Sequence, residues 1–163
     1  MALFVLVALV SASLTYMASN DRALCERLLT WVRAMSFVPA RRWASESSYQ
    51  ELSEIYYFFV CPAFIAMFVA VCLKFGFPVV NKFGSDFTAA RRVKSGLASL
   101  FLLGLSLLFL ANERGGDIRV FHFGTSFQTL LLFGWIIFAL TGILSALAIL
   151  GLIECVTFRK KVV

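Results

Sequence analysis

The sequence predicts an all-α integral membrane protein with four transmembrane helices in a compact bundle and an interfacial amphipathic helix after the first span. Hydrophobic residues make up 61% of the chain and charged residues 15%, whereas soluble domains average about 45–50% and about 25%. The hydrophobic residues also gather into runs close to the roughly 20 residues that cross a bilayer core. Strands of a membrane barrel would alternate polar and apolar residues, and these runs do not alternate.

Four apolar runs divide the 163-residue chain, at residues 2–17, 55–73, 95–111 and 125–155. No Gly/Pro-rich linker separates them, so we expect a single membrane domain over residues 1–163. The first run could be mistaken for a signal peptide, because the small residues Ser11, Ala12 and Ser13 stand at a position suited to cleavage, but it lacks the basic residues that precede a signal-peptide core. We therefore expect it to be a retained span.

The segment after the first span has the pattern of an amphipathic helix over about residues 20–36. Apolar side chains recur there at helical spacing, with charged side chains largely on the other side. The apolar positions are Leu24, Leu28, Val32 and Met35. Such a helix lies in the membrane interface or packs on a partner. The alternative is a covered helix within a loop, with no further role.

Two features flank the start of the second span. Arg41, Arg42 and Trp43 form a predicted interfacial anchor, because arginine and tryptophan both favour the depth of the lipid headgroups. Pro62 stands inside the second apolar run, where we expect it to kink the helix.

Small residues in the third and fourth runs predict where helices pack closely. In lipid, helices associate through close packing at small side chains. The predicted packing residues are Gly96, Gly104, Gly134, Gly142 and Ser145. We expect these two spans to be antiparallel neighbours joined by a tight turn at Gly115 and Gly116.

The fourth run is too long for a simple span. A helix over residues 125–155 would measure roughly 45 Å at about 1.5 Å per residue, against a bilayer core of about 30 Å. Such a helix must tilt strongly or project beyond the membrane. A projecting end would offer a surface to a partner subunit.

The charges are unequal on the two sides of the predicted bundle. With four spans, the second loop and the C-terminus share one side, where eight basic residues stand against two acidic ones. The other side carries seven of each, so the whole net charge of +6 falls on one face. Counts of eight and seven basic residues do not decide the orientation by the positive-inside rule.

The basic face predicts a site for an anionic phospholipid or an acidic partner, because basic residues near a membrane attract anionic headgroups. The residues expected to form it are Arg91, Arg92, Lys94, Arg159, Lys160 and Lys161. Nucleic acid is not an expected partner, because these residues lie next to the membrane edges. A bound phospholipid is expected, and no other cofactor.

Signatures of catalysis are missing from the sequence. It contains no GxSxG, HExxH, GxGxxG, phosphate-binding loop or CxxC. The four cysteines are expected to be buried small residues. His122 is the only histidine, and one histidine cannot supply paired haem ligation. A membrane enzyme using His122 with Glu113 or Asp117 is an alternative that requires these side chains to converge.

The function favoured by these features is that of a non-catalytic accessory subunit of a larger membrane complex. It would pack against other membrane subunits and bind anionic lipid. A respiratory or ATP-synthase complex of an energy-transducing membrane, mitochondrial inner or bacterial inner, fits this description, and a secretion or conjugation machine is equally compatible. A small homo-oligomeric channel or transporter is the main alternative, although few polar residues lie within the spans.

Overall fold

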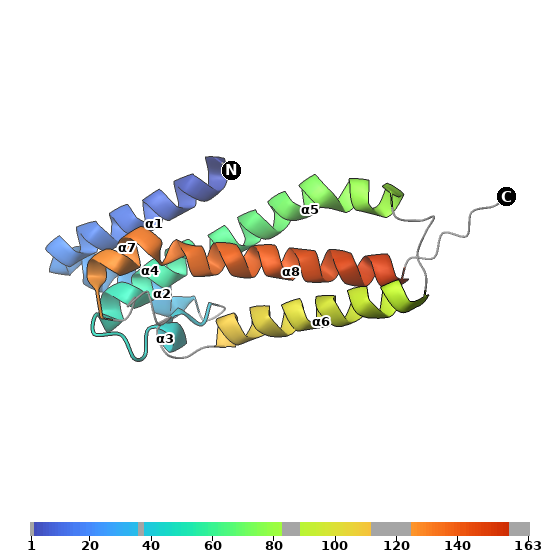
Figure 1. Ribbon diagram of the computed structural model, residues 1–163. Helices are drawn as coiled ribbons and strands as arrows, with labels where there is room; N and C mark the ends of the chain where they lie inside the picture. Colours follow the sequence, from blue (N-terminus) through green and yellow to red (C-terminus); the bar gives the residue numbers. More distant parts are fainter. Residues whose placement is uncertain (1, 36–37, 83–88, 112–124, 157–163) are drawn as a thin grey trace.

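The computed structural model describes residues 2–35, 38–82, 89–111 and 125–156, and every element in this part of the chain is an α-helix (Figure 1). Four apolar segments are long enough to cross a membrane: Leu3–Asn20, Gln50–Phe75, Val93–Ala111 and Phe127–Ile153. Each overlaps one of the predicted runs. The prediction of a four-span helical membrane protein is therefore confirmed.

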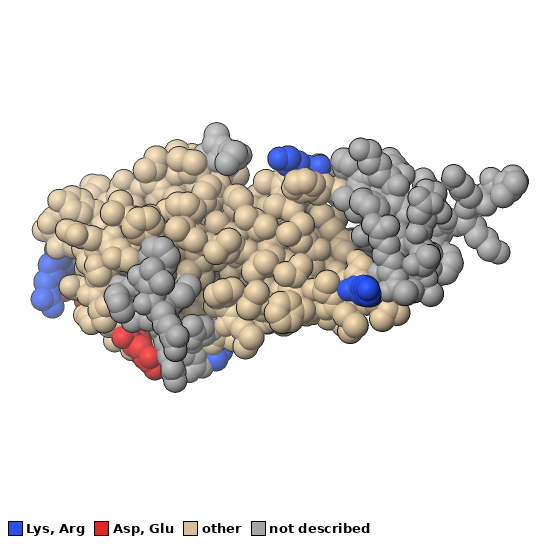
Figure 2. Space-filling view, viewed as in Figure 1, with Lys and Arg blue, Asp and Glu red and all other residues tan. Residues whose placement is uncertain are grey.

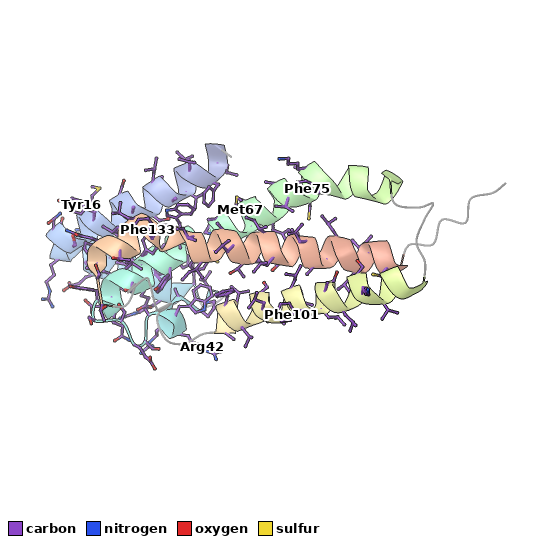
Figure 3. All side chains as sticks on the ribbon, viewed as in Figure 1. Tyr16, Arg42, Met67, Phe75, Phe101 and Phe133 are labelled. Atoms are coloured by element: carbon purple, nitrogen blue, oxygen red, sulfur yellow. The ribbon has the colours of Figure 1, made fainter. Side chains whose placement is uncertain are left out.

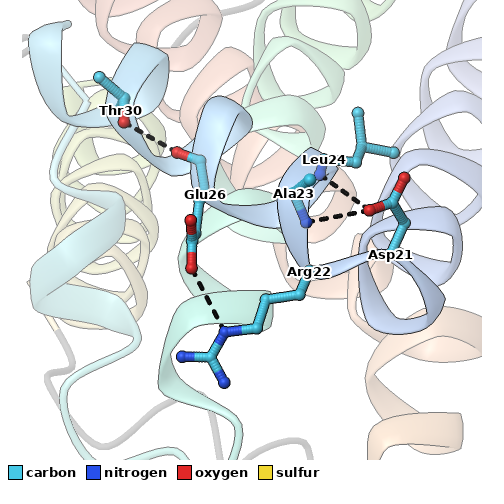
Figure 4. Close-up of polar contacts among 6 residues, drawn as sticks. All are labelled: Asp21, Arg22, Ala23, Leu24, Glu26 and Thr30. Carbon is cyan, nitrogen blue, oxygen red and sulfur yellow. Dashed lines mark hydrogen bonds and ion pairs between the residues drawn. The ribbon is translucent and has the colours of Figure 1, made fainter.

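The first span is α1 (Ala2–Asn20), and α2 (Arg22–Ala34) follows it almost directly. Asp21 separates the two helices, and its carboxylate accepts hydrogen bonds from the backbone N–H groups of Ala23 and Leu24 at 2.9 and 3.2 Å (Figure 4). These N–H groups have no partner inside the helix. Asp21 therefore starts α2 as an N-cap.

The amphipathic helix predicted after the first span is present as α2, packed against α1 and α4 of the same chain. Its buried residues are Cys25, Leu29 and Val32. Of the apolar residues predicted to face inward, Val32 is buried, whereas Leu24 and Leu28 are only half-buried. The buried residues of α2 are those on the side that faces α1 and α4.

The second apolar segment forms two helices, α4 (Gln50–Val60) and α5 (Pro62–Lys82), after the four-residue α3 (Ala40–Trp43). Cys61 stands at the break, directly before Pro62. A proline has no N–H to donate to the preceding turn, and its ring clashes with that turn's carbonyl. The expected interruption at Pro62 is confirmed.

The third span is α6 (Ala89–Ala111), and the fourth apolar segment forms α7 (Phe127–Phe133) and α8 (Trp135–Val156). Helix α8 packs against both α5 and α6, and it runs antiparallel to α6, as predicted (Figure 1). The expectation of one unbroken helix over residues 125–155 is wrong, because the chain turns at Gly134. The ring of Tyr56 lies against Gly134 at this point.

The largest hydrophobic core lies where α3, α4, α7 and α8 meet. It centres on Trp43, Tyr56, Tyr57, Leu130 and Phe138. Outside the core, α1 and α6 expose large apolar side chains along much of their length, such as Phe101 on the outer side of α6 (Figure 3). An exposed apolar surface is what a membrane-spanning helix presents to lipid.

Candidate functional site

The predicted packing glycines of the fourth segment lie at close helix contacts. A Cβ on Gly142 of α8 would lie 2.5 Å from the backbone carbonyl oxygen of Phe64 in α5. A Cβ on Gly134 would lie 2.6 Å from the ring of Tyr56 in α4. Both distances are shorter than real Cβ contacts, so these helices approach as closely as they do only because a glycine is present at each position.

Serine and threonine residues complete the contact between α6 and α8. The hydroxyl groups of Ser106 and Ser145 are hydrogen-bonded across the two helices, and Ser106 also lies 3.4 Å from the carbonyl oxygen of Thr141. All three residues are buried. One turn from the end of α8, a Cβ on Gly151 would clash with the Ser99 hydroxyl. Small residues thus hold the two spans together over most of their length.

The two predicted packing glycines of α6 differ in their surroundings. A Cβ on Gly96 would lie in ordinary contact with the Cys155 sulfur, 3.7 Å away. Gly104 is exposed, and no atom of the described chain lies within 4 Å of the Cβ position. It stands two residues before the buried Ser106, a rotation of roughly 200° around the helix. The prediction that Gly104 packs against the fourth span is therefore wrong.

The predicted basic face lies only partly within the described residues. Lys94 is exposed on α6 and Lys74 is exposed on α5, where its ammonium group lies 5.3 Å from the centre of the Phe75 ring. Arg91 and Arg92 belong to α6, but their side chains lie outside the described part, as do residues 159–161. The turn at residues 113–117 and His122 also lie outside it.

Charged residues of the opposite end gather around the short helices. On the face drawn in Figure 2, the acidic side chains lie at the end of the molecule that carries α2, α3 and α4. Arg41 and Arg42 of the predicted anchor are exposed there. Trp43 is buried instead of lying at the surface, and its indole packs edge-on against Phe138 with ring centres 5.1 Å apart.

A cleft of about 510 Å³ opens between α2, α3 and α4 at this end. Its described lining residues include three arginines and one carboxylate, with apolar side chains and the polar Ser45 and Gln50 making up the rest. The lining residues are Val32, Arg33, Met35, Val38, Pro39, Ala40, Arg41, Arg42, Ser45, Gln50 and Glu54. This volume falls within the range of about 300–1,000 Å³ that is usual for small-molecule sites.

An ion pair joins α2 to α4 beside the cleft. The guanidinium of Arg33 donates from Nε and Nη2 to the carboxylate of Glu54, with the shortest contact 2.9 Å from Nη2 to Oε2. The Glu54 side chain is 1% exposed, whereas that of Arg33 is 46% exposed. The hydrogen bonds to Glu54 raise the pKa of the Arg33 guanidinium above its ordinary value. Arg33 therefore stays charged and neutralises a buried carboxylate.

Sequence reasoning did not anticipate this pair. Glu54 stands at the polar start of an apolar run, where a carboxylate also fits the positive end of a helix dipole. One signal could have suggested the pair. Arg33 lies in the last turn of α2, close to the buried Leu29 and Val32, and α2 packs against α4, the helix that carries Glu54. Helix α2 has three arginines, and only the way in which α2 packs on α4 shows that Arg33 is the one that pairs with Glu54.

Three buried or half-buried hydroxyl side chains inside the spans bond to their own helix. Ser11, Thr15 and Thr141 each donate to the backbone carbonyl four residues earlier in the same helix. Tyr56 differs, because its buried hydroxyl makes no hydrogen bond within the described chain. Among the described residues, no three histidine, cysteine or acidic side chains lie close enough to hold a metal ion.

Comparison with protein-family models, with curated proteins and with solved structures found no match to this chain.

Proposed function

We propose that this four-span membrane protein is a non-catalytic accessory subunit of a larger complex in an energy-transducing membrane, bacterial inner or mitochondrial inner. Its role is to pack against partner helices and to bind anionic phospholipid at its basic end. The observation that carries the proposal is how the spans use their buried polar groups. In the described spans, the hydroxyls of Ser106 and Ser145 bond to each other between two helices. Those of Ser11, Thr15 and Thr141 each bond to a carbonyl of their own helix.

A transporter or channel needs polar groups that face the path of its substrate. In the described spans, Ser106 and Ser145 instead bond to each other between α6 and α8, and Thr141 bonds to the carbonyl of Ile137. Glu54, at the start of the second span, is held by Arg33. This arrangement supports a role in assembly over one in transport.

The outer surface of α6 supplies the expected contact with lipid or with a partner helix. Phe101 is 71% exposed and Leu108 is 69% exposed. Gly104 lies between them in sequence and is exposed as well. Small residues permit close helix approach in membranes, so this surface is the first place to look for a partner.

Extraction of the tagged protein from its native membrane in a mild detergent tests the proposal. We expect it to migrate on a native gel in a large complex, with partner proteins in fixed stoichiometry by mass spectrometry. Migration alone, or as a homo-oligomer of a few 18.2 kDa chains, would overturn the accessory-subunit proposal and make conductance and transport the next assays.

Photo-crosslinking locates the partner surface. A photoreactive amino acid in place of Phe101 on α6 should give one discrete protein adduct in the native membrane. The same residue in place of Lys74, at the basic end of α5, is the matched control and should give a different adduct or lipid only. Lipid adducts alone at both positions would contradict a partner at α6.

A further inference from the structure

We propose that α2 anchors its end of the protein at the surface of the lipid bilayer, with the Trp31 ring beside the glycerol esters and upper acyl chains and Arg27 on a headgroup phosphate. The sequence predicted the interfacial anchor at Arg41, Arg42 and Trp43, but Trp43 is buried in the core. The proposal rests on the indole N–H of Trp31, on the two flanks of α2 and on its position after the first span. It does not depend on membership of a complex.

The three tryptophans of the chain differ in how their indole N–H groups are used. Trp43 donates to the carbonyl oxygen of Leu110 and Trp135 to that of Leu132, each at 2.7 Å. Trp31 is 46% exposed and donates to no acceptor within the described residues. An apolar ring with an N–H left for an outside acceptor suits the membrane interface, where ester and phosphate oxygens lie next to an apolar layer.

The Trp31 ring is held by α4 without being covered by it. Its centre lies 5.3 Å from that of the Phe58 ring, which it meets edge-on, and 5.8 Å from that of the Phe59 ring, to which it is inclined by only 14°. The ring therefore rests on α4 on one side and remains accessible on the other. Because these contacts already fix the ring, little conformational entropy is lost when lipid covers it.

Helix α2 has more apolar surface than the bundle covers. Beside its buried residues runs a second apolar row, in which Leu24 and Leu28 are half-buried and Trp31 is exposed. These three residues lie within roughly 60° of one another around the helix. Arg22 and Glu26 lie roughly 140–180° from Trp31, and there they form an exposed ion pair at 3.3 Å (Figure 4). An apolar flank and a charged flank on one helix are the pattern of a membrane-surface helix.

Arg27 places a positive charge at the edge of this apolar row. It stands one turn before Trp31 on the same side of α2, it is exposed, and it has no ion-pair partner among the described residues. The ion pairs of α2 in this part of the chain use Arg22 and Arg33 instead. A lipid phosphate suits Arg27, because its N–H groups match phosphate oxygens while its aliphatic stem can lie along apolar chains.

The position of α2 puts this row beside lipid. Only Asp21 separates it from α1, whose candidate span ends at Asn20. Tyr16 and Met17 are exposed in the last turns of α1, so the apolar outer surface of that span reaches the start of α2. Helix α2 therefore begins at the edge of the bilayer, and lipid is the material that covers its second apolar row.

Depth-dependent fluorescence quenching of the full-length protein tests the anchor. Trp43→Phe/Trp135→Phe leaves Trp31 as the only tryptophan of the chain, and the matched control Trp31→Phe/Trp135→Phe leaves the buried Trp43. Both proteins are reconstituted in vesicles of phosphatidylcholine and phosphatidylglycerol. The vesicles contain lipid brominated either near the glycerol or near the ends of the acyl chains, and acrylamide serves as the quencher in water.

We expect lipid brominated near the glycerol to quench Trp31 roughly twofold or more above lipid brominated at the chain ends, and to quench Trp43 much less. Quenching of Trp31 by acrylamide but by neither lipid would show that it faces water. Protection from all three quenchers would show that protein covers it, and strongest quenching from the chain ends would place it in the bilayer core. Each of these three results would overturn the proposal. If Trp43→Phe prevents folding, the difference in quenching between the wild type and Trp31→Phe decides the same question.

The role of Arg27 is tested in the protein that keeps only Trp31. Quenching by brominated phosphatidylglycerol is compared with quenching by brominated phosphatidylcholine, which reports the preference for anionic lipid next to this residue. We expect the preference to fall about fivefold in Arg27→Gln and to change little in Arg22→Gln, which removes the same charge from the other flank. Equal losses in both variants would show general attraction to net charge and would contradict a site at Arg27. Lys74 and Lys94 at the basic end are unchanged, so failure here is distinguishable from failure of the proposed function.

Discussion

The indole nitrogen of Trp43 donates a hydrogen bond of 2.7 Å to the backbone carbonyl oxygen of Leu110, 67 residues later in the chain. Leu110 lies in the last turn of α6, where carbonyl groups have no partner inside the helix. The bond thus closes the end of the third span with a side chain from the segment between the first two. It also places α3 and its two arginines against the bundle.

Trp43→Phe tests this connection. The phenyl ring keeps the aromatic contact with Phe138 but cannot donate to Leu110. We expect the free energy of unfolding in detergent to fall by about 1–2 kcal/mol, measured as thermal or denaturant unfolding. Trp31→Phe is the control, because the Trp31 ring is 46% exposed at the surface of α2. Equal effects of the two substitutions would contradict a specific role for the Trp43 bond.

The ion pair between Arg33 and Glu54 should respond asymmetrically to substitution. Arg33→Gln leaves a buried carboxylate without its partner, and such a change costs about 3–5 kcal/mol. Glu54→Gln leaves a half-exposed guanidinium that water can solvate, so we expect a smaller loss. The double variant Arg33→Gln/Glu54→Gln should be more stable than Arg33→Gln alone. A double variant less stable than both single variants would disprove this account.

Close packing of α5 and α8 should depend on the absence of a side chain at Gly142. Gly142→Ala places a methyl group against the carbonyl of Phe64, and we expect a loss of about 1–3 kcal/mol in unfolding free energy from overpacking. Gly104→Ala is the matched control on α6. It should be neutral or stabilising by up to about 1 kcal/mol, because alanine favours helix over glycine. Similar losses at both positions would show that the effect is not one of packing.

The thiol of Cys25 should be slow to react. It is buried between α2 and its neighbours, and burial raises the pKa of the Cys25 thiol above its ordinary value. Because the thiolate is the reactive form, alkylation of Cys25 at neutral pH should be slower in the folded protein than in the detergent-denatured protein. Peptide mapping by mass spectrometry measures the rate at this residue. Equal rates in the folded and denatured protein would contradict the burial.

The same shift has a consequence for stability. The pKa of the Cys25 thiol is higher in the folded state than in the unfolded state. The contribution of the protonated thiol to the free energy of unfolding is therefore complete below the unfolded pKa, and it is lost as the pH rises through the folded pKa. We therefore expect Cys25→Ala to show a smaller loss of stability than the wild type as the pH is raised into the alkaline range. Parallel unfolding curves for the two proteins across that range would refute this.

The sequence by itself determined the class of the protein. Four runs of apolar residues predicted four spans, and helical spacing predicted α2, because both patterns are local properties of the chain. Pro62 marked the break between α4 and α5 for an equally local reason. The antiparallel pairing of α6 and α8 followed from small residues in two consecutive spans.

Tertiary structure alone decided which residues meet. Glu54 pairs with Arg33 and Trp43 bonds to Leu110 because α2 and α3 fold back onto the bundle, and no local pattern specifies that arrangement. The fourth segment is divided at Gly134, where the ring of Tyr56 from another helix lies so close that only a glycine fits. Gly104 turned out to face outward because the rotation of α6 is set by its contact with α8. The cleft of α2, α3 and α4 exists for the same reason: its residues lie apart in sequence, and packing brings them together.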